Sequence, residues 1–440
     1  MPEQHTFLHR LFLSYLRGIN RLGHSDSDDL EYHFLPTEMQ RKIGCRLRLI
    51  LAKSMLQLIS NADVFSPHHL GLMHVLIAGE QIVYVGEKAP DLDECLDVAH
   101  LDMEGARLIP GFIDAHAHVT GGGGEAGYET AVPAPFLSEF TTAGVTTVVG
   151  LLGTDDLVRT TSSLISRLKA LRAEGITAFG YTGGYHIPAT TLTGSVKSDI
   201  VHVEELIGVG ELAISDHRSS QPTLQDILRL ASEAHVAGLM TGKAGVVHFH
   251  VGDGPRGLEL IRQALDISEL PARVFYPTHV NRRKELFEEA CDLTKLGCTI
   301  DITAFPVEEG ENAWSAEDAL LRYLGTDCPI DSVTVSSDGG GCLPVFDEQG
   351  NPVGLDYARA SALPVTMQSL LNKGAELGTI LPAFTSNVAR ILRLSYKGSI
   401  GAGMDADLIV LGDENLPKHV MARGQWHMQD GTPRIRGTFE

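Results

Sequence analysis

The chain has 440 residues, of which 43% are hydrophobic and 21% are charged, so it is long enough to bury a large core. Its 35 basic and 56 acidic residues give a net charge of −21, which repels nucleic-acid phosphates and anionic membrane surfaces. No apolar run approaches the ~20 residues that cross a bilayer, and the 6 cysteines form no CxxC pair. These features argue against a nucleic-acid or membrane partner and predict a protein of the reducing cytoplasm.

The first 54 residues differ in character from the rest of the chain. Apolar residues recur at helical spacing over residues 7–19, and an acidic, Ser-rich segment follows them. His9 and Arg10 interrupt the apolar stretch and no small-residue cleavage site follows, so a secretory signal is not predicted. Glu3 and the acidic segment run against an organelle transit helix. We therefore interpret residues 1–54 as a dispensable extension.

Two β-rich segments flank the long middle of the chain. Residues 55–108 contain short strand-like runs separated by Gly and Asn turns, namely LQLISNADVF, MHVLIAGEQIVYVG and ARLI. Residues 395–440 resume the same style with ADLIVLG and HVMARGQWHMQDG. We predict that the two ends of the chain together form one small β-sandwich domain.

The middle of the chain, residues 109–394, alternates between two kinds of segment. Apolar, β-branched runs alternate with stretches of helical period such as PTLQDILRLASEAHVAGL and RRKELFEEACDLTKLG. Eight strands with intervening helices are what a TIM-like (β/α)8 barrel requires, so we predict an α/β fold of this kind, with a doubly wound sheet as the alternative. The eight runs are RLIPGFIDAHAH, GVTTVVGLLGT, ITAFGYTGGYH, ELAISDHR, GVVHFHVGD, RVFYPTHVNR, GCTIDITA and SVTVSSDGG.

Polar residues gather at the C-terminal end of each run, which is the barrel face where active sites form. The first run ends in His116-Ala117-His118, and strand alternation places both imidazoles on one side, where they can bind one cation. Two partly buried structural histidines would give the same pattern, and any one such residue is more often structural than functional. Later runs add groups with metal-ligand chemistry: Glu211, or Asp216 and His217, in the fourth, His250 in the fifth, His279 in the sixth and Asp338 in the eighth.

These motifs resemble a known family. The segment PGFIDAHAH, with the two later histidines and the aspartate, is similar to the amidohydrolase superfamily, and GSIGAGMDADLIVL resembles the segment with which those enzymes return to their small β domain. Within the superfamily, GGGGEAG, VVGLLGTD, TGGYH, TGSV, ISDHRS, PTHVNR, VTVSSDG and RGTFE resemble the bacterial isoaspartyl dipeptidases, in family order from about Met55 to Glu440. The resemblance implies a homo-oligomeric hydrolase that cleaves the β-aspartyl peptide bond of small dipeptides.

The resemblance also implies two Zn²⁺ ions per chain. On this template His116 and His118 hold the first ion, His250 and His279 hold the second, and Asp338 binds the first ion and handles protons. Two cations that flank one water lower its pKa enough to supply a bridging hydroxide at neutral pH, and they polarise the carbonyl that it attacks. Asp338 is then expected to take a proton from this nucleophile and pass it to the leaving amine.

The group that bridges the two ions departs from the family pattern. The family has a lysine carboxylated by CO2 at this place in strand four, and the matching position here, counted back from residues 215–218, is Glu211. Glutamate is also an anionic oxygen donor that can bridge two zinc ions, although it is shorter than carboxylated lysine by roughly two or three bonds. Lys243 lies in a TGKAG turn, and we interpret it as structural or solvent-exposed.

The same resemblance implies the substrate contacts. An isoaspartyl dipeptide carries one ammonium and two carboxylates, so its pocket needs one anion and two cations. Glu125 matches the position for the ammonium, and Arg218 and Arg282 match the positions for the carboxylates. Tyr185 is expected to donate to the scissile carbonyl oxygen. Two further contacts are implied, Thr154 and Cys342, the latter where the family has a serine.

Two other functions remain open. A dihydroorotase or hydantoinase would also use an HxH motif, two further histidines and an aspartate, but is expected to lack GGGGEAG and the motifs around Tyr185 and Arg218. A non-catalytic assembly protein with the same fold typically loses metal ligands, whereas here only the bridge is changed, and it is changed to another ligand. The metal content of the purified protein separates the second possibility from an enzyme.

Overall fold

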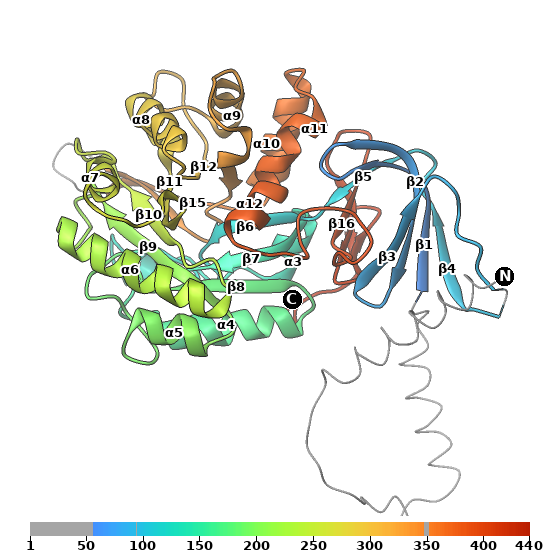
Figure 1. Ribbon diagram of the computed structural model, residues 1–440, viewed down its shortest axis with the longest axis horizontal. Helices are drawn as coiled ribbons and strands as arrows, with labels where there is room; N and C mark the ends of the chain where they lie inside the picture. Colours follow the sequence, from blue (N-terminus) through green and yellow to red (C-terminus); the bar gives the residue numbers. More distant parts are fainter. Residues whose placement is uncertain (1–55, 94, 347–351) are drawn as a thin grey trace, which may run out of the picture. The chain divides into compact units, whose positions relative to one another are not determined.

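The computed structural model describes residues 56–93, 95–346 and 352–440, which are coloured in Figure 1. The described residues all belong to one compact unit that begins at residue 54. The predicted extension, residues 1–54, lies outside the described residues, so its role stays a prediction. Among the described residues, no helix has the length and apolar character needed to span a membrane.

Parallel strands form the centre of this unit. Six of them make one sheet in the order β11-β10-β9-β8-β7-β6, and β12 and β13 make a second, two-stranded sheet. The two ends of this set meet, because Asp338 N donates to His116 O and His118 N donates to Gly339 O. The fold is therefore a mixed α/β fold with a curled parallel sheet, consistent with the predicted barrel. The strands are β6 (Phe112–Ala117), β7 (Val145–Gly150), β8 (Thr177–Thr182), β9 (Leu206–Ile214), β10 (Val247–Val251), β11 (Phe275–Thr278), β12 (Ile300–Thr303) and β13 (Val333–Ser336).

Each of the eight predicted runs contains or overlaps one of these strands. The fourth strand begins earlier than the run ELAISDHR indicates, because the preceding residues LIGVG are also apolar enough to be buried. Beyond β13 the chain forms the antiparallel hairpin of β14 (Cys342–Phe346) and β15 (Pro352–Tyr357).

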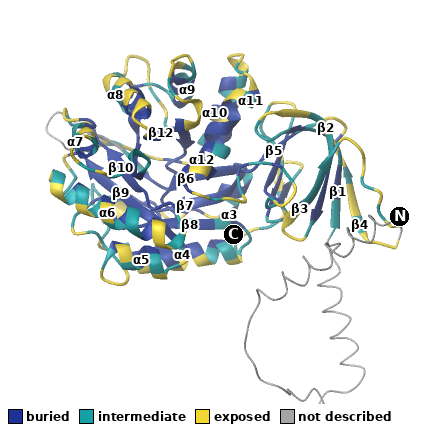
Figure 2. Ribbon diagram, viewed as in Figure 1, coloured by how far each residue is buried: buried dark blue, intermediate teal, exposed yellow. Residues whose placement is uncertain are grey.

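Helices alternate with the strands and present their buried faces to the sheet, as Figure 2 shows. In α6, Thr223 caps the first turn by accepting a hydrogen bond from Asp226 N, and Gly242 ends the helix with φ of 76°. The α-helices are α3 (Leu137–Thr142), α4 (Thr161–Ala173), α5 (Val196–His202), α6 (Leu224–Thr241), α7 (Glu259–Ile267), α8 (Lys284–Lys295), α9 (Ala316–Leu324), α10 (Ala362–Asn372), α11 (Leu377–Ile380) and α12 (Ser386–Ile391). Short 3-10 helices are η1 (Tyr128–Thr130), η2 (Ala272–Val274), η3 (Val280–Arg282), η4 (Ile330–Ser332) and η5 (Leu381–Phe384).

Both ends of the described chain build one sheet. Its nine strands run in the order β19-β18-β17-β16-β5-β1-β2-β3, with β4 paired to β1. The predicted sandwich is not confirmed, because all nine strands belong to a single hydrogen-bonded sheet, while the predicted division at residues 108 and 395 stays a prediction. The strands are β1 (Leu56–Phe65), β2 (His69–Ala78), β3 (Gln81–Gly86), β4 (Val98–Asp102), β5 (Arg107–Pro110), β16 (Leu408–Leu411), β17 (Pro417–Ala422), β18 (Gln425–Gln429) and β19 (Thr432–Pro433).

Strand β16 connects this sheet to the barrel core. Leu408 and Val410 pack into the small core of the nine-stranded sheet, whereas Ile409 and Leu411 pack into the large core that includes the barrel helices. Successive side chains of a strand point to opposite faces, so one strand serves both cores. All four residues are consequently buried.

Candidate active site

The carboxyl ends of five barrel strands bring the predicted metal ligands together. Two groups of three residues have ligand atoms that all lie within 4.8 Å of one another. One group comprises His116, His118 and Asp338, and the other comprises His116, Glu211 and His279. His250 completes the set beside Glu211. All six side chains belong to buried residues.

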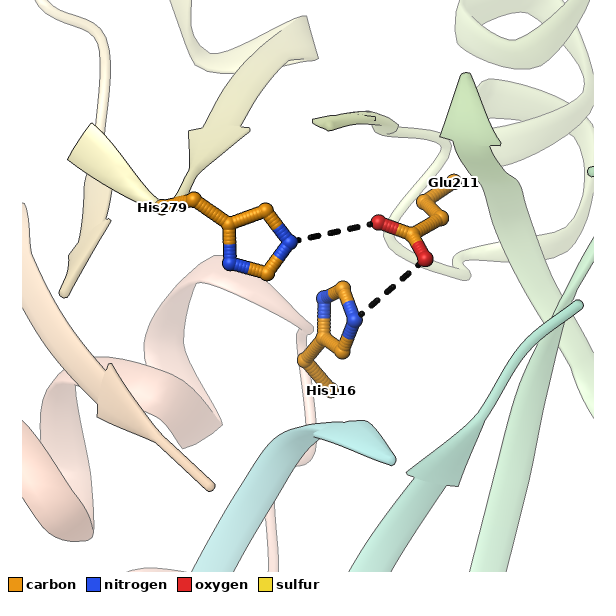
Figure 3. A group of neighbouring side chains, drawn as sticks. All are labelled: His116, Glu211 and His279. Carbon is orange, nitrogen blue, oxygen red and sulfur yellow. Dashed lines mark ion pairs between the residues drawn. The ribbon is translucent and has the colours of Figure 1, made fainter. Parts of the chain in front are cut away.

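Glu211 lies at the centre of this arrangement. Its Oε1 is 3.6 Å from His116 Nε2 and 3.3 Å from His118 Nε2. Its Oε2 is 3.2 Å from His250 Nδ1 and 3.5 Å from His279 Nε2. Figure 3 shows His116, Glu211 and His279 converging from different strands. Each carboxylate oxygen therefore faces one of the two predicted histidine pairs.

The local backbone explains how Glu211 reaches this place. The pairing of β9 with β10 shifts register between Val209 and Leu212, so one extra residue is accommodated there. Such a bulge re-aims a side chain beside an active site. Glycines make room around the ligands: a Cβ on Gly153 would lie 2.6 Å from His118 Cε1. His279 and Asp338 themselves adopt φ values of 60° and 56°, a region that residues other than glycine rarely occupy outside functional sites.

Burial and neighbouring charges shift the pKa values of the predicted ligands in different directions. Burial opposes ionisation of Glu211, but the positive charge of His116 and contacts with His118 and His250 hold its pKa well below the usual range. Burial likewise works against a charged His118, yet contacts with Asp338 and Glu211 raise its pKa to about 9. His279 differs, because burial lowers its pKa to about 3. The centre thus needs positive charge beside Glu211 and Asp338, which a divalent cation also supplies.

Three buried atoms of the predicted ligand residues have no hydrogen-bond partner. Two of them, His116 Nε2 and Asp338 Oδ1, lie 3.3 Å apart, and the third is His118 Nδ1. Buried polar atoms without partners are rare and require an explanation such as an ion that belongs between them. Nitrogen donors combined with carboxylate oxygens suit Zn²⁺ and related first-row ions. The residues present therefore fit a metal centre.

The predicted substrate contacts line the same cavity as the metal ligands. The cavity has a volume of about 390 Å³, and the six predicted contacts in its wall are Glu125, Thr154, Tyr185, Arg218, Arg282 and Cys342. Burial raises the pKa of the Cys342 thiol to about 11, so this side chain is neutral near pH 7.

Hydrogen bonds within the cavity show which of the predicted substrate contacts lie against one another. Glu125 Oε1 accepts a hydrogen bond from Thr154 Oγ1 at 3.0 Å and lies 3.3 Å from Arg218 Nη1. Arg282 instead donates to Val251 O at 3.2 Å. The carboxylate predicted to bind an ammonium therefore contacts Arg218, and the second arginine stands apart from it.

A sequence profile described as the Amidohydrolase family matches residues 107–427. The chain belongs to the amidohydrolase family. The β-aspartyl dipeptidase of Fervidobacterium islandicum AW-1, solved in complex with β-Asp-Leu dipeptide, is 42% identical in sequence and has a TM-score of 0.81. That similarity covers 86% of this chain and 99% of the solved one. The motif-based resemblance to these hydrolases is thereby confirmed.

More distant similarities agree with the fold. Dihydropyrimidinase from Brevibacillus agri NCHU1002 is 16% identical with a TM-score of 0.61 over 87% of this chain and 97% of that one, which shows a common fold only. Among curated relatives, adenine deaminase 2 of Carboxydothermus hydrogenoformans is 25% identical over 351 residues. The match covers 76% of this chain and 52% of the deaminase, so the amidohydrolase described here spans about half the length of that relative.

Two residues that support the ligands of this amidohydrolase were not identified from the sequence. His248 Nε2 lies 2.9 Å from His116 Nδ1, and Thr303 Oγ1 lies 2.7 Å from His279 Nδ1. Partners on the second ring nitrogen fix the orientation of a ligating histidine. The spacing in His248-Phe249-His250 places both histidines on one side of β10, so alternation alone contained a signal for His248. No local sequence pattern indicated that Thr303 supports a ligand.

Two acidic residues, Glu211 in β9 and Asp216 just after this strand, contact the predicted histidine ligands in different ways. Glu211 lies among them, whereas Asp216 lies 2.9 Å from His250 Nε2 on the outer side of that ring, and His217 is exposed. Lys243 Nζ donates to Ile200 O at 2.6 Å, so its contacts in this amidohydrolase are structural.

Proposed function

We propose that the protein is an isoaspartyl dipeptidase that hydrolyses the β-aspartyl peptide bond with a binuclear zinc centre on a (β/α)8 barrel. One observation carries the proposal: the two oxygens of Glu211 face separate histidine pairs inside a cavity that also contains Glu125, Arg218 and Arg282. The 42% identity to an enzyme solved with β-Asp-Leu supports the same substrate class. A cytoplasmic location and a homo-oligomeric state stay predictions.

Different residues of the chain would bind the two ions and transfer the proton. His116, His118 and Asp338 would hold one ion, His250 and His279 would hold the other, and Glu211 would lie between them. Bound zinc ions supply an activated water and polarise the carbonyl of the scissile bond. Asp338 Oδ1 lies 3.1 Å from His118 Nε2 and 3.3 Å from His116 Nε2 at the wall of the cavity, and Asp338 would accept a proton and return it to the leaving amine.

Substrate selection follows from the charges in the cavity wall. Arg218 and Arg282 would bind the two carboxylates of the dipeptide, since guanidinium groups match carboxylate geometry. Glu125, held by Thr154, would bind the ammonium. Tyr185 would donate to the carbonyl oxygen as negative charge develops there. An α-linked dipeptide cannot reach the ions with its carbonyl and Arg282 with its carboxylate at the same time.

Turnover of three substrates tests the proposal. We expect the full-length protein to contain about two zinc ions per chain, to hydrolyse β-Asp-Leu, and to leave α-Asp-Leu and dihydroorotate unchanged. Activity on dihydroorotate alone would identify a cyclic-amide hydrolase instead. A protein with no bound metal and no turnover would be a non-catalytic member of the family.

A further inference from the structure

One carboxylate at the end of β9 contacts both halves of the candidate active site. Asp216 is 6% exposed, and its Oδ2 lies 2.9 Å from His250 Nε2. The same oxygen accepts a hydrogen bond from Arg218 Nη2 at 2.8 Å. Its Oδ1 accepts from Arg218 Nε at 3.1 Å and from Arg218 N at 2.7 Å. A predicted metal ligand and a predicted substrate contact therefore share one buried partner.

The contact with His250 determines which ring nitrogen faces the metal centre. His250 Nδ1 lies 3.2 Å from Glu211 Oε2 and 2.8 Å from the Tyr185 hydroxyl. For Nδ1 to offer its lone pair to an ion beside Glu211, the ring proton must be on Nε2. Asp216 Oδ2 is the acceptor at Nε2, so it favours this tautomer and holds the ring in this orientation.

The contact with Arg218 fixes the direction of the guanidinium. Two of its nitrogens donate to the two oxygens of Asp216, which is the fork geometry that arginine and carboxylate prefer. This leaves Nη1 directed to Glu125, 3.3 Å away in the wall of the cavity. Without Asp216 this largely buried guanidinium would lose the two hydrogen bonds that fix its direction, and its contact with Glu125 would no longer hold it in place for a substrate carboxylate.

We infer that Asp216 is a positioning residue that couples metal binding at His250 to dipeptide binding at Arg218. The inference rests on the proposed function, because both the ion and the dipeptide belong to it. Its distinctive consequence is that one conservative substitution should weaken two separate properties of the enzyme, and that these two losses should depend on different neighbours of Asp216.

The first experiment compares Asp216→Asn with the unsubstituted protein. We expect the affinity for the more weakly held zinc ion to fall about 10- to 100-fold in chelator competition, because a partner of a ligating histidine is lost. We also expect KM for β-Asp-Leu to rise about 10-fold or more, and the absorption spectrum of the Co²⁺-substituted protein to change. Asp155→Asn is the matched control, because Asp155 lines the same cavity but pairs with Arg159 at 2.6 Å. It should leave metal affinity and KM unchanged.

A double-substitution experiment separates the effect of Asp216 on Arg218 from its effect on His250. In an Arg218→Ala background, Asp216→Asn should raise KM little further, since the route through Arg218 is already lost, whereas the loss of zinc affinity should persist in full. An equal additional rise in KM in both backgrounds would overturn the coupling. If Asp216→Asn fails to fold, Asp216→Glu keeps the charge and moves the carboxylate by one methylene, and an unchanged zinc affinity in that variant would overturn the inference.

The remaining outcomes distinguish this inference from the function on which it rests. Unchanged zinc affinity and KM in a folded Asp216→Asn protein, or the same losses in Asp155→Asn, would overturn the positioning role alone. Absence of zinc binding and of β-Asp-Leu turnover in the unsubstituted protein would overturn the proposed function and the inference together.

Discussion

Two clusters of buried charge in this molecule differ in how completely their atoms are paired. One is the candidate metal centre at the carboxyl ends of the barrel strands. The other lies beside the first residue of β8, where Lys397 Nζ is 2.5 Å from Asp407 Oδ2, 3.0 Å from Asp405 Oδ2 and 2.6 Å from Thr177 Oγ1. We call these three charged residues, Lys397, Asp405 and Asp407, the lysine cluster.

The two clusters handle burial of charge in opposite ways. No buried side-chain atom of the lysine cluster lacks a hydrogen-bond partner among the described residues, whereas His116 Nε2 and Asp338 Oδ1 of the metal centre do lack one. The lysine cluster is complete in itself, and it contacts the nine-stranded sheet and the barrel at once. The metal centre is incomplete and opens into a cavity. A buried charge cluster that faces a cavity with atoms lacking hydrogen bonds indicates a binding site, and a cluster whose buried atoms are all hydrogen-bonded indicates a structural role.

The largest expected effect comes from removing the central carboxylate of the metal centre. Glu211→Ala should lower kcat/KM for β-Asp-Leu by about 10³-fold or more, because the second ion loses its only predicted anionic ligand. Glu211→Gln should be similarly impaired, since the amide lacks the negative charge. Turnover and zinc content measure the loss, and circular dichroism checks that the variant is folded. Near-normal zinc content and turnover in Glu211→Ala would contradict the bridging role.

The lysine cluster should show the reverse behaviour. Lys397→Met should lower the free energy of unfolding by about 3 to 5 kcal/mol, because the 5%-exposed Asp407 keeps its charge without its partner. The kcat of the folded fraction should not change. Adding Asp407→Asn should recover part of the stability, and urea unfolding monitored by circular dichroism provides the measurement. Equal stability of Lys397→Met and the unsubstituted protein would show that complete pairing is no guide to a structural role.

The pH dependence of the lysine cluster has a definite sign. Burial opposes the charge of Lys397, but Asp407 and Asp405 together raise its pKa above the ordinary 10.5. A raised lysine pKa stabilises the folded state below the unfolded value, and the contribution disappears as pH rises through the folded value. Stability should therefore decline above about pH 10.5, more steeply in the unsubstituted protein than in Lys397→Met. Parallel stability curves for the two proteins at alkaline pH would contradict this.

A smaller effect is expected from substituting His248, which contacts the predicted ligand His116. His248→Phe keeps an aromatic ring but removes the acceptor for His116 Nδ1, so zinc affinity should fall about 10- to 100-fold. His248→Gln retains an acceptor and should recover most of the affinity. Tyr181→Phe is the control, because the Tyr181 ring packs 5.2 Å from His248 while its hydroxyl has no hydrogen-bond partner. Similar zinc affinities in His248→Phe and Tyr181→Phe would assign His248 to packing alone.

The last prediction is that bicarbonate has no effect on the recovery of activity. If Glu211 bridges the ions, no carbamate has to form, so the metal-free protein reconstituted with zinc should recover the same activity in degassed buffer as with added bicarbonate. A requirement for bicarbonate would point to a lysine-derived bridge and away from Glu211. Lys243 is the nearest candidate in sequence, but its Nζ contacts Ile200 O and Val203 O.

The sequence by itself determined the strands and most of the candidate ligands. Strand runs, HxH spacing and polar residues at strand ends are local properties, because alternation and hydrophobic periodicity depend only on neighbours along the chain. The β-rich character of residues 55–108 and 395–440 was predicted for the same reason. The sequence did not predict whether these strands form a single sheet or a sandwich, because that depends on which distant strands share hydrogen bonds.

Only the tertiary structure decided how the ligands face one another. Glu211 points to both histidine pairs because the register shifts between β9 and β10, and a shift of one residue moves a side chain to the other face of a strand. Asp216 reaches His250 and Arg218, and His248 reaches His116, through contacts whose distances are set by the packing of separate strands. Such partners are far apart along the chain or on opposite sides of a bulge, so no local pattern encodes their contact.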